Sequence, residues 1–285
     1  MKEIAINLVS DLVSITLFAI FWAVVYLWFF WRRKKSCLHF FGVQNEPPNI
    51  CIYLSRLAVK PGGTTSLEST KSGYSGLAIV KPEYDGALLI QEQLQSKILA
   101  FLPKTLQEWL GQSSAILKIL NVSIKISPSL PLQNGIFSNN LLILGTGVYN
   151  SLAQYYLKDF LPHHRNRYFF YEKNSEGERV IGIRQKGLED TLIKGRSYGN
   201  EIAFIQRIND DFTQKDFEIT VFICAGLGSS ATYGSVRYLA ENWRDLQRKF
   251  KDKEFGICLS FPNQASDDEF VRPAEVIQTF LAEKN

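Results

Sequence analysis

The distribution of hydrophobic residues divides the chain into one long apolar run near the N-terminus and a series of shorter runs after it. Residues 12–31 read LVSITLFAIFWAVVYLWFFW, with no charged side chain and with Ser14 and Thr16 as the small polar residues. About 20 apolar residues in a helix are enough to cross a hydrocarbon core of about 30 Å. The run ends in tryptophan, and the basic run Arg32–Lys35 follows directly. This pattern predicts an N-terminal anchor of residues 1–35, with residues 12–31 in the lipid bilayer as a single transmembrane helix.

The basic run also predicts the side of the membrane on which the rest of the chain lies. Short segments rich in lysine and arginine stay in the cytoplasm, so everything after Lys35 is expected there. Residues 36–48 are interpreted as a connector, because Pro47 and Pro48 prevent a helix from continuing. The expected protein is therefore a single-pass membrane protein with a cytoplasmic soluble part.

The first half of this soluble part, residues 49–130, is interpreted as a first α/β lobe. An apolar, β-rich run over 50–59 predicts a buried strand, and alternating polarity over 119–127 predicts another. Between them, Pro82 and Glu83 open a stretch with apolar residues at helical spacing. Proline and an acidic residue at this point are typical of a helix N-terminus.

The second half, residues 139–285, repeats a simpler pattern of apolar strand, glycine turn and helix. Strands are predicted over 140–145, 167–173, 179–185, 201–210, 219–226 and 255–261, and helices over 151–161, 230–250 and 273–283. The first of these helices is expected to end at Pro162. The repetition predicts an α/β fold with a Rossmann-like, mostly parallel sheet and helices on both faces. The sequence leaves open whether the first lobe extends this sheet or stands apart.

Composition and charge narrow the functional classes. The chain has 285 residues, 46% of them hydrophobic, and a formal net charge of +4, part of which comes from Arg32–Lys35. A duplex nucleic-acid partner is not expected, because such binding requires a concentrated basic face. The four cysteines show no CxxC spacing and the chain has three histidines, so neither a metal site nor a disulfide framework is expected.

The first candidate site is the turn GTGVYN of residues 145–150, between a predicted strand and a predicted helix. Gly145 and Gly147 take two of the three glycine positions of the dinucleotide-binding fingerprint, and Asn150 takes the third. Glycine lets the backbone approach a phosphate, which the N–H groups of the next helix can bind. Glu172, at the end of the next predicted strand, stands roughly where such folds bind a ribose. The alternative is ordinary turn chemistry, with Asn150 as the helix cap.

The second candidate site is the turn GLGSSAT of residues 226–232, which also joins a strand to a helix. Gly226, Gly228, Ser229 and Ser230 would form a nest of small residues and hydroxyls for an anion at the helix N-terminus. The turn lacks the lysine of a P-loop, which disfavours a Walker-type NTPase. The alternative is a helix cap by a hydroxyl side chain.

Two further features carry possible chemistry. In residues 195–199, Arg196 would bind a phosphate through two hydrogen bonds and Tyr198 would stack on a base, with a solvated turn as the alternative. Enzymes that cleave N-glycosidic bonds place a single glutamate in a setting like that of Glu83, although an acid at a helix N-terminus is also ordinary. A serine hydrolase is disfavoured, because no G-x-S-x-G elbow is present and no histidine follows Ser229.

A membrane helix joined to a Rossmann-like lobe with the turns GTGVYN and GLGSSATYGSVRYL resembles the membrane-anchored sensors of prokaryotic defence. Those proteins join a transmembrane segment to a CARF- or SAVED-like domain that binds cyclic oligonucleotides. The resemblance covers the architecture and two short turns. It implies that ligand binding acts through formation of a homo-oligomer.

Three hypotheses follow. The leading one is a cytoplasmic domain that senses a nucleotide or another phosphate-containing small molecule and passes the signal to the membrane helix. Its site would consist of the first turn (Gly145, Gly147, Asn150), the second turn (Gly226, Gly228, Ser229, Ser230), and Arg196 with Tyr198. The second is an enzyme acting on NAD or a nucleoside, either a dehydrogenase-like site with Glu172 or a glycosidic-bond cleaver with Glu83. The third is a membrane-tethered scaffold without a ligand.

Overall fold

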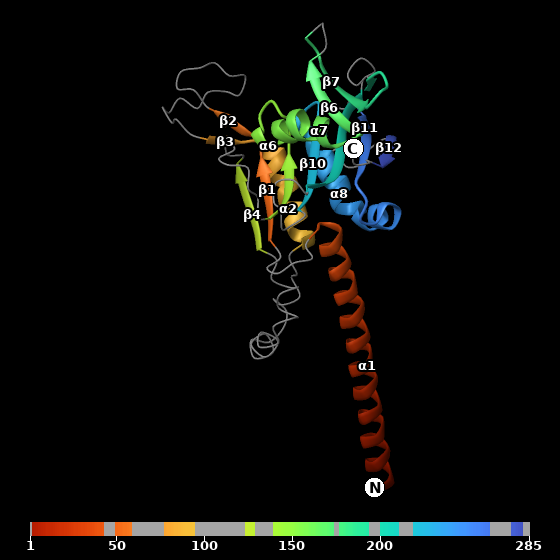
Figure 1. Cartoon of the computed structure of the whole chain (residues 1–285). Helices are drawn as coiled ribbons and strands as arrows, with labels where there is room; N and C mark the ends of the chain where they lie inside the picture. The colour runs from red at the N-terminus through yellow and green to blue at the C-terminus, as the bar shows by residue number, and fades with distance from the viewer. Residues whose placement is uncertain are drawn as a thin grey trace.

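The computed structural model describes residues 2–42, 49–58, 77–94, 123–128, 139–173, 177–193, 200–210, 219–262 and 275–281, and of residues 2–11, 56–58, 77–78, 128, 173, 200 and 262 only the backbone. Figure 1 shows the arrangement of these segments: an α/β domain from one end of which a single long helix projects. The N-terminus lies at the far tip of this helix, and the C-terminus lies on the domain.

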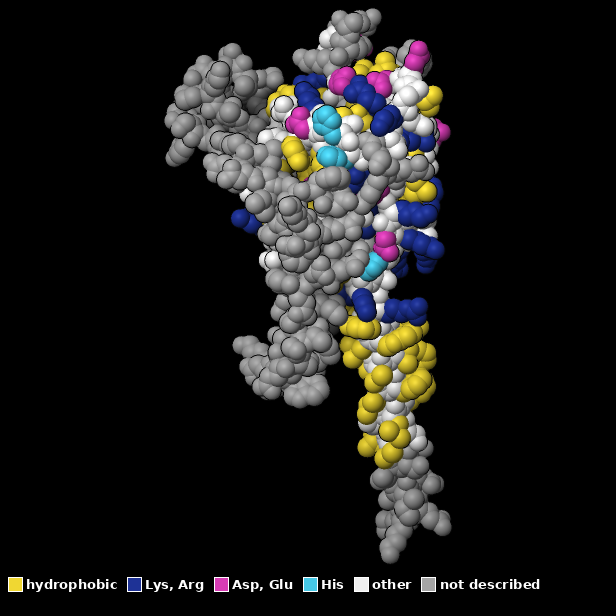
Figure 2. Space-filling view, viewed as in Figure 1, with side chains coloured by type: hydrophobic (Ala, Val, Ile, Leu, Met, Phe, Trp, Pro, Cys, Tyr) yellow, Lys and Arg dark blue, Asp and Glu magenta, His cyan; other side chains and the backbone are white. Residues whose placement is uncertain are grey.

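The projecting helix is α1 (Lys2–Phe40). Its segment Leu12–Phe40 contains an 18-residue window with a mean hydropathy of 2.2 and is long and apolar enough to cross a membrane. Large apolar side chains such as Phe18, Trp22 and Phe29 are exposed on it. Figure 2 shows hydrophobic side chains along the visible face of this helix. The predicted span of residues 12–31 lies wholly inside this helix.

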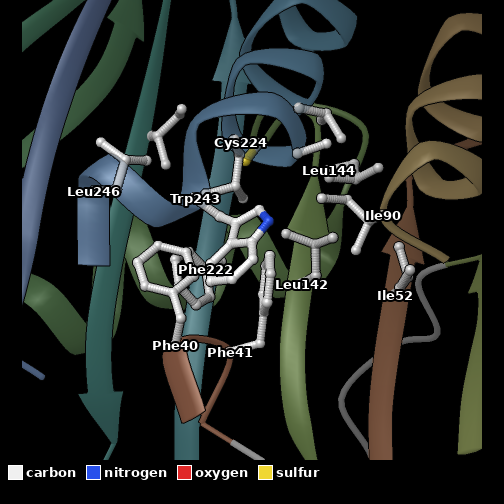
Figure 3. Packing of buried hydrophobic residues seen from close by; sticks show 14 of the residues in the cluster. Phe40, Phe41, Ile52, Ile90, Leu142, Leu144, Phe222, Cys224, Trp243 and Leu246 are labelled. Carbon is white, nitrogen blue, oxygen red and sulfur yellow. The ribbon is translucent and has the colours of Figure 1, made fainter. Parts of the chain in front are cut away.

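The last turns of α1 belong to the core of the domain, which corrects the prediction of a connector over 36–48. The helix runs on to Phe40, and the side chains of Cys37, Leu38, Phe40 and Phe41 are buried. Figure 3 shows Phe40 and Phe41 rising from the end of α1 toward Phe222 and Trp243. Residues 43–48 lie outside the described residues. Burial of two adjacent phenylalanine rings is more favourable than their exposure to water in a connector. The end of α1 therefore lies in the core.

The main sheet has seven strands in the order β12–β11–β9–β10–β5–β1–β4. Its strands are β12 (Glu275–Leu281), β11 (Phe255–Pro262), β9 (Asn200–Asp210), β10 (Ile219–Gly226), β5 (Asn140–Leu144), β1 (Asn49–Leu54) and β4 (Ser123–Pro128). β2 (Arg56–Ala58) and β3 (Leu77–Ile79) form a separate antiparallel pair. Because β1 and β4 are hydrogen-bonded next to β5, the strands predicted in the first lobe extend the sheet of the second half.

The sheet is mixed, with most strands in one direction. β4, β1, β5 and β10 are parallel neighbours. β9 is antiparallel to both β10 and β11, so β11 points the same way as β10. β9 and the edge strand β12 run in the opposite direction. The carboxyl ends of five strands therefore lie at one edge, and their amino ends lie at the other, from which α1 projects (Figure 1).

Both faces of the sheet are covered, as predicted. α2 (Lys81–Leu94), α8 (Ser229–Phe250) and the end of α1 cover one face, with Leu142 and Leu144 of β5 beneath them. On the other face, Leu141 and Ile143 of the same strand pack against α6 (Ser151–Gln154) and the elements that follow it. The alternation along β5 is the expected consequence of strand geometry. The helix predicted over 230–250 is α8, and its apolar stripe is buried, with Val236, Leu239, Trp243, Leu246 and Phe250.

The helix predicted over 151–161 is longer and less regular than expected. α6 continues into a π-helix, η1 (Tyr155–Phe160), and then into α7 (Leu161–His164). Pro162 therefore does not end the helix. It lies in the first turn of α7, where the missing N–H of proline is tolerated, and the N–H of Leu161 bonds to the carbonyl of Tyr156 in the wider π pattern.

The last predicted helix, residues 273–283, is wrong. Residues 275–281 form strand β12, which pairs with β11. The segment EVIQTFL contains β-branched and aromatic residues that suit a strand, and the free edge of β11 offers it hydrogen bonds. Its Phe280 is buried beside Phe169, with ring centroids 4.9 Å apart. Tertiary pairing thus outweighs the helical spacing of the apolar residues.

A second, three-stranded sheet follows α7. It has the order β6–β7–β8, with β6 (Arg167–Lys173), β7 (Arg179–Gln185) and β8 (Thr191–Ile193) all antiparallel. It packs over the main sheet on the face of α6. The strand that follows the first glycine turn and its helix therefore leaves the main sheet, and the predicted repetition of strand, turn, helix and strand is interrupted there.

A buried ion pair joins the second half of the fold. Arg165, directly after α7, donates from Nε and Nη2 to the two carboxylate oxygens of Glu254 at 2.6 and 2.7 Å. Both side chains are buried, and Arg165 also donates to the carbonyl oxygens of His164 and Asn209. Glu254 in turn accepts the backbone N–H of Asn209 at 3.0 Å. The pair fixes the end of α7 against β9 and the start of β11.

Candidate ligand site at the carboxyl edge of the sheet

The carboxyl ends of β1, β5 and β10 lie side by side at the edge of the sheet that faces away from α1. The helices that follow β1 and β5 pack on opposite faces, α2 with Leu142 and α6 with Leu141. Two neighbouring parallel strands whose connections go to opposite faces form a topological switch point, and open α/β sheets bind ligands in the crevice outside it. The two glycine turns predicted as ligand sites both open at this edge.

The first turn begins at Gly145, which has a positive φ of +95°. Its N–H donates to the carbonyl oxygen of Cys224 on β10 at 2.9 Å. A Cβ at this position would lie 2.1 Å from Ser55 Oγ and 2.6 Å from Glu83 Oε1. The glycine is required because the end of β1 and the start of α2 approach the turn closely. The spacing of the glycines in the sequence did not predict this contact of Gly145 with Ser55 and Glu83.

Asn150 is the N-cap of α6, which confirms the structural alternative for this residue. Its Oδ1 accepts the N–H groups of Leu152 and Ala153, at 3.1 and 3.2 Å. Its Nδ2 donates to the carbonyl oxygens of Tyr53 and Leu144, at 3.2 and 2.9 Å. The side chain is 1% exposed, and these four bonds use the full capacity of an amide. Asn150 therefore shapes the turn and has no capacity left for a ligand.

The tip of the first turn is the part of it that faces solvent. Gly147 is partly exposed, and Val148 and Tyr149 are 51% and 42% exposed. Arg179, at the start of β7, lies over the Tyr149 ring at 5.8 Å and donates from Nη2 to the Tyr149 hydroxyl at 3.3 Å. This hydrogen bond, followed by the nearby Tyr171, raises the pKa of Arg179. The guanidinium group therefore faces hydroxyls and stays charged.

Tyr171 on β6 completes this group. Its hydroxyl is buried, and the side chains of Thr146 and Arg179 lie within its reach. Burial raises the pKa of Tyr171, so the hydroxyl remains protonated and able to donate. Arg179 and Tyr171 were missed because they reach the turn from a hairpin that carries no recognisable motif.

Ser55 and Glu83 form a buried pair beneath the same turn. Ser55 follows β1, where it interrupts the predicted strand over 50–59, and Glu83 lies in the first turn of α2. Glu83 accepts the backbone N–H of Ser55 at 2.7 Å and its hydroxyl at 2.8 Å. The glutamate is 4% exposed. Burial raises the pKa of Glu83 from its ordinary value of 4.5 to about 7, against the opposing effect of the two bonds from Ser55.

Replacing Glu83 with glutamine should remove a pH dependence of stability. As the pH rises from about 4.5, the unfolded chain releases the proton of Glu83 while the folded chain keeps it until about pH 7. The contribution of Glu83 to the free energy of unfolding is therefore fully present below pH 4.5 and is lost as the pH rises through 7. The loss amounts to roughly 3 kcal/mol. Urea unfolding at pH 5 and pH 8 should show a smaller fall in the free energy of unfolding for Glu83→Gln than for the natural chain. Equal falls in the two proteins would contradict the raised pKa.

The second turn is mainly a packing feature. A Cβ on Gly226 would lie 2.7 Å from both Ala231 Cβ and Thr232 N, so this glycine allows α8 to start directly against β10. Gly228 is the N-cap with an extended φ of −136° and no side-chain cap. Thr232 Oγ1 accepts the N–H of Gly226 at 3.0 Å and donates to the carbonyl oxygen of Gly228 at 3.1 Å. Ser229 and Ser230 are at the surface of this turn without a capping role.

A carboxylate of the protein already lies at the N-terminus of α8. A Cβ on Gly228 would be 3.3 Å from both carboxylate oxygens of Glu201 on β9. A negative side chain at a helix N-terminus is favourable, and it opposes a second anion at the same point. The first turn also has a carboxyl group close to its glycine, that of Glu83, but its exposed tip has the guanidinium group of Arg179 beside it and is the more favourable of the two for an anion.

The remaining candidates fall elsewhere. Arg196 and Tyr198 lie outside the described residues. Glu172 lies on β6 in the second sheet and pairs with Arg184 at 3.4 Å, so it is not next to β5 where the ribose carboxylate was expected. His163 and His164 are in α7. In the part of the chain that the structure describes, no group of three His, Cys, Asp or Glu side chains could hold a metal ion.

Comparison of the chain with models of known protein families, with curated proteins and with solved structures finds no match, so its own geometry carries the functional proposal.

Proposed function

We propose that this chain is a membrane-anchored sensor whose Rossmann-like domain binds a nucleotide or another phosphate-containing small molecule at the carboxyl edge of its sheet. The observation that carries the proposal is the switch point between β1 and β5, with the guanidinium group of Arg179 and the hydroxyl of Tyr171 beside its exposed turn. A guanidinium group that faces hydroxyls suits a phosphate. Tyr149 offers the half-exposed ring beside it.

The anchor is α1, with the apolar residues 12–31 in the bilayer. Its exposed surface is apolar on every side, which in water would be costly and in lipid is favourable. The basic run Arg32–Lys35 favours a cytoplasmic position for the domain. In this orientation the carboxyl edge faces the cytoplasm, where nucleotides are available.

A binding role is supported over an enzymatic one by the state of Glu83. A pKa near 7 suits a general acid or base. However, both carboxylate oxygens accept hydrogen bonds from Ser55, and the side chain is 4% exposed. The glutamate therefore holds the turn in place and is not presented to a substrate.

The position of α2 supports transmission of a signal. Its first turn carries Glu83, next to Gly145 of the candidate site. Its last residue, Leu94, accepts a hydrogen bond through its carbonyl oxygen from the buried Lys34 of α1. One helix thus joins the ligand edge to the membrane helix. Ligand binding is proposed to act through this connection on the association of chains into a homo-oligomer.

The test is ligand binding by the full chain in mild detergent, with Arg179→Ala as the variant. We expect stabilisation by at least one of NAD, ATP, cyclic oligonucleotides or inorganic phosphate in a thermal unfolding screen. Loss of a charge-assisted contact should weaken binding of that compound by roughly ten- to a hundredfold in isothermal titration.

Arg184→Ala is the matched control, because Arg184 lies on the same strand and is held by Asp190 at 2.6 Å. It should bind like the natural chain. Equal affinity of Arg179→Ala and the natural chain would place the site elsewhere. A natural chain that binds none of the compounds would favour the scaffold hypothesis.

A further inference from the structure

Basic side chains from two distant parts of the sequence meet where α1 enters the domain. Arg33 and Lys35 lie at the end of the apolar run of α1, and Arg244 and Arg248 lie in the last two turns of α8. These four residues are exposed and are called the α1–α8 basic patch below. Figure 2 shows lysine and arginine side chains directly above the apolar band of α1 and along the same side of the domain.

The patch carries more positive than negative charge. Partial burial, followed by the nearby positive charges of Arg33 and Arg248, lowers the pKa of Arg244. Among the described residues, two carboxylates face the patch: Asp245, which pairs with Arg248 at 3.2 Å, and Asp252, which pairs with His39 at 3.0 Å. Other exposed basic residues surround it, namely Arg32, Lys249, Lys251 and Lys253. Clustered positive charge of this kind attracts an anionic partner.

The level of the patch along α1 identifies the partner. Arg32 lies over the ring of Trp28 at 5.5 Å, and Lys35 lies over the ring of Trp31 at 5.4 Å. Tryptophan at the end of an apolar helix marks the membrane–water interface, so the cations next to these rings lie among the lipid headgroups. The last turns of α8 pack beside this part of α1.

We propose that the α1–α8 basic patch binds anionic phospholipid headgroups and thereby fixes the domain against the membrane surface. The proposal rests on the membrane anchoring proposed above. It adds a contact that the domain itself makes with the bilayer through α8. Each lysine or arginine near an anionic leaflet favours the bound state by roughly fivefold, and salt weakens this attraction.

The experiment uses the full chain in nanodiscs of phosphatidylcholine alone or mixed with phosphatidylglycerol. Lys249, Lys251 and Lys253 are acetylated with an amine reagent and quantified by mass spectrometry, with Lys81 at the opposite edge of the domain as the internal reference. We expect acetylation of the three lysines, relative to Lys81, to be about fivefold slower or more in discs that contain phosphatidylglycerol. High salt should remove the difference, and Arg244→Glu with Arg248→Glu should remove it at low salt.

Arg237→Glu and Arg248→Glu form a matched pair, because each reverses one charge of α8 and breaks one intrahelical ion pair, with Glu241 and Asp245 respectively. Arg237→Glu should keep the protection, and Arg248→Glu should weaken it. Equal acetylation in both kinds of disc, with the chain incorporated in both, would contradict headgroup binding by the α1–α8 basic patch. It would not contradict membrane anchoring by α1. Failure to enter either disc would overturn the anchor, and the headgroup contact with it.

Discussion

Phe40→Ala should lower the free energy of unfolding of the full chain by about 3–5 kcal/mol, the usual cost of removing a fully buried phenylalanine ring. Phe40 is 0% exposed, and its ring centroid lies 5.3 Å from that of Phe222 and 6.3 Å from that of Phe255. The guanidinium of Arg207 lies 5.7 Å from the same ring. Urea unfolding in mild detergent, followed by tryptophan fluorescence, measures the change.

Phe29→Ala is the control, because Phe29 lies on the same helix but is exposed. It should leave the free energy of unfolding of the domain nearly unchanged. Similar small effects of both substitutions would mean that the end of α1 is not part of the core. The same reasoning applies to truncation: removal of residues 1–33 keeps Cys37–Phe41 and should leave a folded domain, whereas removal of residues 1–41 should not.

Arg165→Met should destabilise the fold by about 3–5 kcal/mol, because it leaves the carboxylate of Glu254 buried without its charged partner. Glu254 accepts two hydrogen bonds from Arg165 and a third from the backbone N–H of Asn209. Chemical unfolding of the variant and the natural chain at neutral pH gives the difference.

The double variant Arg165→Met with Glu254→Gln should recover part of this loss, since no charge is then left unpaired. Arg248→Ala removes an exposed ion pair, with Asp245, and should change the free energy of unfolding by less than about 1 kcal/mol. A loss for Arg165→Met no larger than that for Arg248→Ala would show that the buried pair contributes little.

The elements whose side chains follow one simple period could be predicted from the sequence. The buried stripe of α8, the apolar length of α1 and the continuous apolar run of β10 depend on local spacing alone, and the structure has them where they were expected. The strand β12 was missed because its apolar positions fit a helix locally. The hydrogen bonds that decide the matter come from β11, across the sheet.

The candidate site was predictable only in its backbone. The glycine turns mark the carboxyl edge of the sheet, but the groups that give this edge its chemistry come from other elements. Glu83 reaches the first turn from α2, Arg179 reaches it from β7, and Glu201 reaches the second turn from β9. No spacing along the chain encodes such contacts, since they depend on how the two sheets and the helices pack.

The burial of the end of α1 also sets an order for biosynthesis. Phe40 and Phe41 leave the ribosome with the N-terminal helix, but their partners Phe222 and Phe255 are translated only in the last third of the chain. Until then both rings have no core to enter, and contacts between segments so far apart in sequence form slowly. The apolar part of α1 must therefore be placed before the domain has folded. A nascent chain that stalls before β11 leaves the side chains of Phe40 and Phe41 exposed to chaperones.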